Sequence, residues 1–290
     1  MLVTQVLITG IVMGAIYAIT GAGLVVIYRT TGVINFAHGD LAAVGLFCAY
    51  GALQLGAPYA VAAVVAIAAS AALAAGLGRV VGSRLFRRRP VLDLIVLTIS
   101  AGLILQGLEG VIIGQSVRTF PSIAGGQVAR IGSVGIGADD IIVVSVCVVV
   151  FCALYAFFER TRTGASMRAL NENAEATRLL GVPVTRLRTL AWMVAGALAG
   201  IAGLFVAPIY SLQPTSMEVL VVYGFAVVVA GGFESVVGAL VCGILVGILQ
   251  NAVSVFASSK LVLIAVAAFM LVVLAIRPTG LLGRRPVVRV

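Results

Sequence analysis

The chain has 290 residues, of which 62% are hydrophobic and 10% are charged, and its formal net charge at pH 7 is +9. A soluble globular chain carries roughly 25% charged residues, so this composition excludes a water-soluble domain and predicts a polytopic membrane protein. The apolar runs last roughly 17–23 residues without the alternation of an outer-membrane barrel. We therefore expect one all-α transmembrane domain over residues 1–290, with about eight to ten segments that include broken or half helices.

The positive charge does not indicate nucleic-acid binding. Lys260 is the single lysine among 19 basic residues, and the arginines gather at the ends of apolar runs, as the positive-inside rule describes. The four cysteines lie in or beside apolar runs without metal-ligand spacing, so we expect buried apolar roles and no metal site. No basic stretch precedes the first apolar run, so a cleaved signal peptide is not expected.

The first expected span, about residues 5–27, is followed by the polar stretch YRTTGVINFAHGD at 28–40. This stretch is too polar for a plain span and too short and apolar for an external loop. Non-helical backbone at membrane depth persists only where protein buries it or where it lines a watery cavity. The sequence therefore predicts a helix break inside the membrane.

Thr31, Asn35, His38 and Asp40 are the candidate residues of this break. Two interpretations stay open: they border a permeation route, as intramembrane polar residues often do, or His38 satisfies the broken helix with Asp40 or Asn35. A lone histidine without partners does not predict acid–base catalysis. Gln106 and Glu109 carry the same ambiguity, since Glu109 either pairs across helices or lies near an external mouth.

The remaining runs predict further spans at about 41–55, 58–80, 91–114, 141–158, 189–207, 219–230, 236–256 and 261–276. The run at 219–230 is too short to cross a core of about 30 Å at 1.5 Å per residue, so it predicts a half-helix. The Gly-rich stretch 115–140 predicts the external loop, with short strands at 118–123 and 127–136. A short external link is expected at 208–218, and a break at 231–235.

The longest polar stretch is residues 159–188, and its arginines place it on the cytoplasmic side. Its middle predicts a short helix with Asn171 or Asn173 as N-cap. Gly181 is expected to end that helix in the left-handed conformation. Exposed Leu179 and Leu180 then either dock into a groove on a soluble partner or rest on headgroups or on the chain itself.

Charge distribution also predicts the orientation, with the N-terminus outside and the C-terminus in the cytoplasm. This places the Arg-rich links 79–89, 159–188 and 277–290 inside and 115–140 outside. Gly14-Ala15 and Ile27-Tyr28 recur 182 residues later as Gly196-Ala197 and Ile209-Tyr210. Chance and a true internal repeat both explain this echo, and interrupted helices at matching places are typical of transporter repeats.

Several stretches resemble a known family. TTGVINFAHGDLAAVG (residues 30–45) is similar to a signature of branched-chain amino acid ABC transporter permeases of the LivH type. RTRTGASMRALNENAEATRLLGVPV (160–184) resembles the cytoplasmic coupling loop of that family, and residues 223–240 and 277–283 resemble its later landmarks. Glu175-Ala176-Thr177 with Gly181 fits the EAA-x-x-x-G pattern of ABC importers, except that Thr177 replaces the second alanine.

The resemblance implies a multi-pass subunit of the bacterial inner membrane, in an ATP-driven importer of branched-chain or related small amino acids. It implies as partners a second homologous permease, two cytoplasmic ATPase subunits that bind ATP, an extracytoplasmic substrate-binding protein and membrane lipid. It also implies a set of ATPase-coupling residues: Arg168, Asn171, Glu172, Asn173, Glu175, Arg178, Leu179, Leu180 and Gly181.

Other functions stay open at this point. Relatives of this type also serve urea, short amides and aromatic acids, and a stand-alone secondary transporter or channel is the alternative from another class. The sequence has no Walker A loop and no catalytic constellation, so we expect no enzyme activity and no cofactor in this chain. A pathway with few charges suits a neutral or zwitterionic solute, without a fixed high-affinity site.

Overall fold

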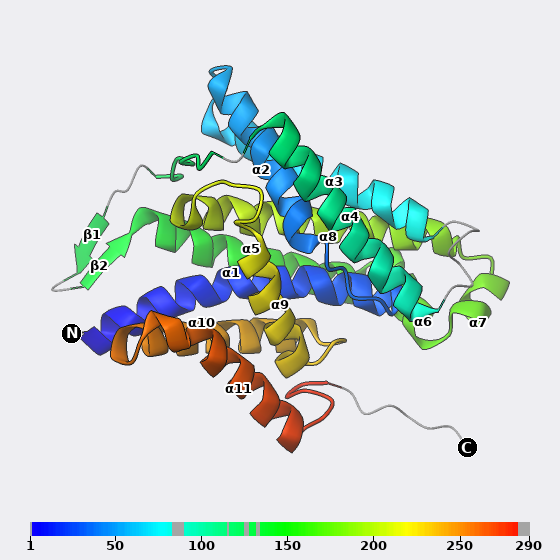
Figure 1. The fold of residues 1–290 in the computed structure, drawn as a ribbon. Coiled ribbons are helices and arrows are strands. Elements are labelled where there is room, and N and C mark those ends of the chain that lie inside the picture. Colours follow the sequence, from blue (N-terminus) through cyan, green and yellow to red (C-terminus); the bar gives the residue numbers. More distant parts are fainter. Residues whose placement is uncertain (1, 83–89, 115, 125–127, 132–133, 284–290) are drawn as a thin grey trace.

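The computed structural model describes residues 2–82, 90–114, 116–124, 128–131 and 134–283. Within them the fold is a helical bundle with one two-stranded hairpin (Figure 1). The elements in chain order are α1 (Leu2–Thr31), α2 (His38–Gln54), α3 (Tyr59–Val81), α4 (Val91–Ile112), β1 (Val128–Ile131), β2 (Val134–Gly137), α5 (Ala138–Arg160), α6 (Arg162–Glu172), α7 (Ala174–Leu179), α8 (Val184–Tyr210), α9 (Glu218–Gly231), α10 (Val236–Phe256), the 3₁₀ turn η1 (Ser259–Leu261) and α11 (Val262–Ile276).

The predicted polytopic helical membrane fold is confirmed. Seven helices of the described chain are long and apolar enough to cross a membrane. The shorter helices α2 and α9, of 17 and 14 residues, bring the number of segments to nine, within the expected range of about eight to ten. The half-helix expected at 219–230 and the break after it are both present, because α9 ends at Gly231 and α10 begins at Val236.

Helices α1 and α8 form the centre of the bundle (Figure 1). The apolar window of α1 is 94% buried, whereas that of α4 is only 11% buried. Glycines permit the close packing: a Cβ at Gly14 would lie 2.6 Å from Ile244 Cα of α10, and one at Gly196 of α8 would lie 3.0 Å from Ala71 Cα of α3. Small residues at such positions let membrane helices approach closely.

The order of elements is repeated. A long helix, a break, a short helix and a further span occur first as α1, α2 and α3 and again as α8, α9 and α10. In both copies the residue after the long helix has a positive φ, at Gly32 (+67°) and Ser211 (+62°). Figure 1 shows α1 and α8 running in opposite directions. This arrangement supports an inverted internal repeat, the second explanation of the echo.

Several predicted boundaries are wrong. Helix α8 continues to Tyr210, so Pro208 lies inside the helix and not in the external link; residues 204–207, just before it, are buried and hold the last turn in place. The strand expected at 118–123 is only an isolated bridge between Arg118 and Leu212, whereas the strands expected at 127–136 form the β1–β2 hairpin. Helix α5 begins at Ala138, inside the expected loop 115–140.

The basic links are described only in part. Residues 83–89 and 284–290, which hold much of the Arg-rich charge used to orient the chain, lie outside the described residues. The hairpin and α7 lie at opposite ends of the bundle (Figure 1). The side-chain amide of Gln5 donates to the Gly135 carbonyl at 3.2 Å, so the N-terminal end of α1 lies beside the hairpin.

Candidate functional site

Two short helices, α6 and α7, fill the polar stretch between α5 and α8. The Thr161 hydroxyl caps α6 by accepting from the Gly164 N–H at 2.9 Å. Met167 and Leu170 are buried, and a Cβ at Gly164 would lie 2.7 Å from Phe158 Cα, so α6 packs firmly against the end of α5. Of the two expected N-caps, Asn171 is wrong, because this packing holds it inside α6.

Helix α7 is fixed at both ends by local hydrogen bonds. Asn173 is its N-cap, and its Oδ1 accepts from the N–H groups of Glu175 at 3.0 Å and Ala176 at 2.9 Å. At the other end Gly181 has φ +78°, its N–H donates to the Arg178 carbonyl, and the Val182 N–H donates to the Thr177 carbonyl. These two bonds make the Schellman motif predicted at Gly181.

The surface of α7 is apolar at its C-terminal end. Leu179 and Leu180 are 85% and 81% exposed, and Glu175 and Arg178 are exposed beside them. Thr177 faces inward, and its hydroxyl donates to the Asn173 carbonyl at 2.7 Å. Figure 1 shows α7 at the end of the bundle, away from its centre. Unlike the exposed apolar residues of the membrane spans, these two leucines lie in the long polar stretch of residues 159–188.

The other predicted coupling residues separate into two groups. Asn171, Glu172 and Asn173 are exposed at the junction of α6 and α7. Arg168 does not belong with them, because its guanidinium pairs with the Glu159 carboxylate of α5 at 3.3 Å. Arg168 therefore ties α6 to α5 and does not extend the exposed surface of α7.

The polar side chains of the helix break between Thr31 and His38 are mostly buried and hydrogen-bonded to nearby backbone. The Thr31 hydroxyl donates to the Ile27 carbonyl at 2.8 Å, and Asn35 Oδ1 accepts from the Ala37 N–H at 3.1 Å. Asn35 and His38 are both fully buried. A Cβ at Gly23 of α1 would lie 2.6 Å from His38 Cε1, so the imidazole packs directly on α1.

The predicted pairing of His38 with Asp40 or Asn35 is wrong. Neither imidazole nitrogen has a hydrogen-bond partner among the described residues. The absence of a Cβ at Gly23 makes room for the ring in the bundle core, so His38 acts as a packing residue. Neither His38 nor Asn35 lines an open route in this structure.

Asp40 is the residue of the predicted break that reaches the charged side chains of other helices. Its carboxylate contacts Gly102 of α4, and it interacts electrostatically with Glu109 of α4 and Glu218 of α9. The Gln106 amide of α4 donates to Glu218 Oε1 at 2.6 Å. We call Asp40, Glu109 and Glu218 the acidic junction, because one carboxylate comes from each of α2, α4 and α9.

Sequence patterns alone did not predict that these residues lie together, since Gln106 and Glu218 are 112 positions apart. The available signal was the presence of acids in apolar helices, which are functional candidates by default. No group of three His, Cys, Asp or Glu residues with geometry for a metal ion occurs in the part of the chain that is described.

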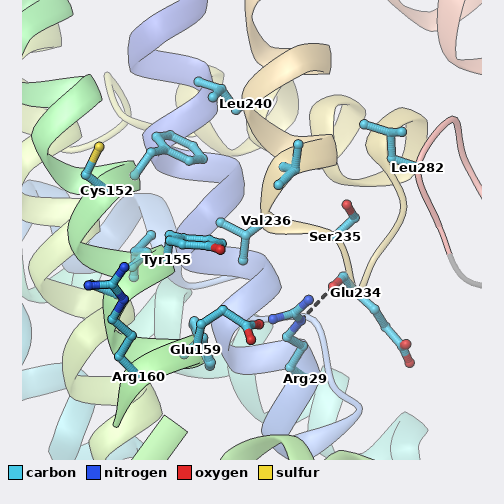
Figure 2. Close-up of a pocket in the computed structure, with 15 residues that line it drawn as sticks. Arg29, Cys152, Tyr155, Glu159, Arg160, Glu234, Ser235, Val236, Leu240 and Leu282 are labelled. Atoms are coloured by element: carbon cyan, nitrogen blue, oxygen red, sulfur yellow. Dashed lines mark hydrogen bonds between the residues drawn. The ribbon is translucent and has the colours of Figure 1, made fainter.

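A cavity of about 620 Å³ lies elsewhere, between the C-terminal ends of α1 and α5 and the link from α9 to α10 (Figure 2). Its charged side holds Arg29, Glu159, Arg160 and Glu234. Arg29 Nε donates to the Glu234 carbonyl at 2.6 Å, the dashed line in Figure 2, and the guanidinium lies 5.3 Å from the Phe158 ring centroid. Arg29 thus fixes the second helix break against α1.

A second arginine makes the matching contact at the first break. Arg188, in the second turn of α8, donates from Nε to the Thr30 carbonyl at 3.3 Å. The polar stretch that carries α6 and α7 is therefore joined to the first break directly, and through α5 to the cavity beside the second. Arg188 reaches the end of α1 directly, and the Arg168–Glu159 pair leads to the cavity that Arg29 lines.

Residues 6–276 match the protein family described as branched-chain amino acid transport system / permease component. The chain is 27% identical over 304 residues to the high-affinity branched-chain amino acid transport system permease protein LivH of Escherichia coli (strain K12), covering 99% of this chain and 97% of that protein. It is 31% identical over 257 residues to the ribose import permease protein RbsC of the same strain, covering 85% and 77%.

A solved structure shares the fold. The structure titled PsaBC from Streptococcus pneumoniae in complex with Fab has a TM-score of 0.52 at 14% identity, and the match covers 95% of this chain and 92% of that one. At this identity the likeness is one of architecture alone.

Proposed function

Because this chain belongs to the branched-chain amino acid transport system permease family, we propose that it is the membrane subunit of an ATP-driven importer in the bacterial inner membrane. We propose branched-chain or related small amino acids as its substrates. The observation that carries the proposal is the match over residues 6–276, together with near full-length similarity to LivH. The shorter match to a ribose permease makes ribose the competing substrate to test.

The partners follow from surfaces that the single chain leaves uncovered. Helices α4 and α11 expose most of their apolar side chains, which suits a second homologous permease and surrounding lipid. The capped helix α7, with Leu179 and Leu180 exposed, suits a groove on one of the two cytoplasmic ATPase subunits, the helix-in-groove mode. The hairpin end would then face outward and receive the substrate-binding protein, with the N-terminus outside and the C-terminus inside.

The contacts also suggest how ATP-driven motion reaches the membrane. In this proposal, closure of the ATPases moves α7, and α6 follows because Asn173 joins the two helices. Arg168 passes the motion to α5 through Glu159, and Arg188 passes it to the end of α1 at Thr30. Both routes end at or beside helix breaks, where a change of angle needs few lost hydrogen bonds.

The test is transport by the purified complex in proteoliposomes. We expect leucine uptake only when ATP is present on the side of the membrane that carries the ATPase subunits, and only when the binding protein is also present. ATP-independent leucine uptake by this chain alone would instead identify a secondary transporter or channel. Uptake of ribose but not leucine would overturn the substrate assignment. Isolated permease is expected to show no tight leucine binding, since the binding protein provides the selection.

A further inference from the structure

The acidic junction follows α4, where Asp40 contacts Gly102 and Gln106 bonds Glu218. Figure 1 shows α4 and α9 crossing in front of the long helices α8 and α1. Asp40 is half-buried, Glu218 is exposed, and Gln106 is half-buried. The junction therefore extends from the exposed Glu218 to the buried Glu109.

Glu109 is the member of the junction that most needs a partner. Its side chain is 4% exposed, and neither carboxylate oxygen has a hydrogen-bond partner among the described residues. A carboxylate inside the membrane is costly, and intramembrane acids normally face a cavity or a positively charged group. The structure therefore leaves Glu109 ready to accept hydrogen bonds from a group that this chain does not supply.

The helices that form the junction supply no cation, and the nearest one described at this end of α4, Arg118, donates to the Ile113 carbonyl and lies over the Tyr50 ring. Helices α2, α4, α9 and α11 contain no arginine or lysine, so nothing on these helices neutralises the three carboxylates. The spacing does not suit a metal ion, as found above within the described residues. An organic ammonium group fits better, because it offers three N–H donors that successive carboxylates can accept in turn.

The surroundings suit an amino acid with an apolar side chain. The absence of a side chain at Gly102 lets the Asp40 carboxylate lie directly against α4. The rings of Phe36 and Phe225 lie 6.0 Å apart close to the start of α2. A branched aliphatic group would bury apolar surface here while its ammonium group contacts the carboxylates.

We propose that Asp40, Glu109 and Glu218 are the specificity-determining residues that receive the ammonium group of an amino acid in transit, an inference that rests on the proposed function. Glu109 lies one turn from the end of α4 at Ile112, and Asp40 contacts Gly102 about 10 Å farther along the helix, at 1.5 Å per residue. Glu218 lies within the same junction, and Gln106 orients its carboxylate. The acidic junction would attract the ammonium groups of zwitterions and cations and would repel anions that lack an ammonium group.

The experiment compares the complete importer with a double variant, Glu109→Gln and Glu218→Gln, in proteoliposomes. We expect leucine transported per ATP hydrolysed to fall at least tenfold. The probe is 3-methylbutylamine, which keeps the ammonium group and branched chain of leucine. It should inhibit uptake by the unaltered importer, and its inhibition constant should rise at least tenfold in the double variant. 4-Methylpentanoate, the anion of similar shape, should inhibit neither.

Two controls make the result decisive. Asp93→Asn removes a carboxylate of α4 outside the junction and should leave both leucine uptake and amine inhibition unchanged. Glu109→Asp keeps the charge and should retain amine inhibition, a rescue that a purely structural role would not produce.

Three outcomes are informative. Equal amine inhibition in the double variant and the unaltered importer would overturn the proposal. So would loss of the second permease from the purified double variant, because the carboxylates would then pair with a cation on that subunit. An unaltered importer that carries no leucine would refute the proposed function itself, and this is seen before any variant is made.

Discussion

Gly181 allows the role of α7 to be tested through backbone geometry alone. Its φ is +78°, and a Cβ built there meets no atom within 4 Å, so a larger side chain has room. The cost of Gly181→Val therefore comes from the left-handed backbone, at about 1–2 kcal/mol. A change of that size alters a local equilibrium roughly 5–30-fold. The Schellman bonds at Gly181 and Val182 would open, and α7 would fray from its C-terminal end.

The assay is binding of the purified ATPase subunit to the permease in nanodiscs, with leucine uptake per ATP measured in the complete importer. We expect Gly181→Val to weaken binding roughly 5–30-fold, by the reasoning above, and to lower coupled uptake. Thermal unfolding should not change, because Gly181 packs against nothing. The ATPase affinity of Gly181→Asn should lie between those of the unaltered protein and Gly181→Val, since asparagine tolerates the left-handed region better than valine.

The matched control is Gly76→Ala in α3. A Cβ at Gly76 also meets no atom within 4 Å, but its backbone is helical, so alanine is expected to be neutral or slightly stabilising. Unchanged ATPase affinity and uptake in Gly181→Val, with the same protein yield, would refute our placement of α7 at the ATPase interface.

Three further predictions concern the same helix and the bundle core. Leu180→Asp should leave thermal unfolding unchanged, because the side chain is 81% exposed, but it should abolish co-purification of the ATPase; retained co-purification would count against docking through α7. Glu175→Lys puts a positive charge in the first turn of α7 and should weaken ATPase binding by about 0.3–1 kcal/mol, measured by titration at low salt and lost at high salt. Gly196→Leu should destabilise the detergent-purified protein by about 1–3 kcal/mol, since even a Cβ would lie 3.0 Å from Ala71 Cα; a melting temperature equal to that of Gly107→Ala, where the space is open, would contradict the close α3–α8 packing.

The features predicted correctly from the sequence depend on neighbours within a few turns. The run at 236–256 is α10 to the residue, because apolar length and the flanking break decide a membrane helix locally. The caps of α7 were also recognisable, since a cap needs only a side chain or a left-handed residue three or four positions from its partner.

Local rules failed where two equal choices competed or where packing overrode them. Asn171 and Asn173 are equally good caps by type, and burial of Met167 and Leu170 under α5 kept Asn171 inside α6. His38 had plausible polar partners two and three residues away, yet its ring packs in the core, in the space that the missing side chain of Gly23 leaves.

The sequence by itself determined the membrane class, the approximate spans and the short capped helix α7, because hydropathy and capping act over short distances along the chain. Only the tertiary structure decided which carboxylates meet. Asp40, Glu109 and Glu218 come from three helices, and their proximity depends on how closely the helix backbones pack. That distance is set by glycines such as Gly102, whose effect depends on the residue facing them across the bundle.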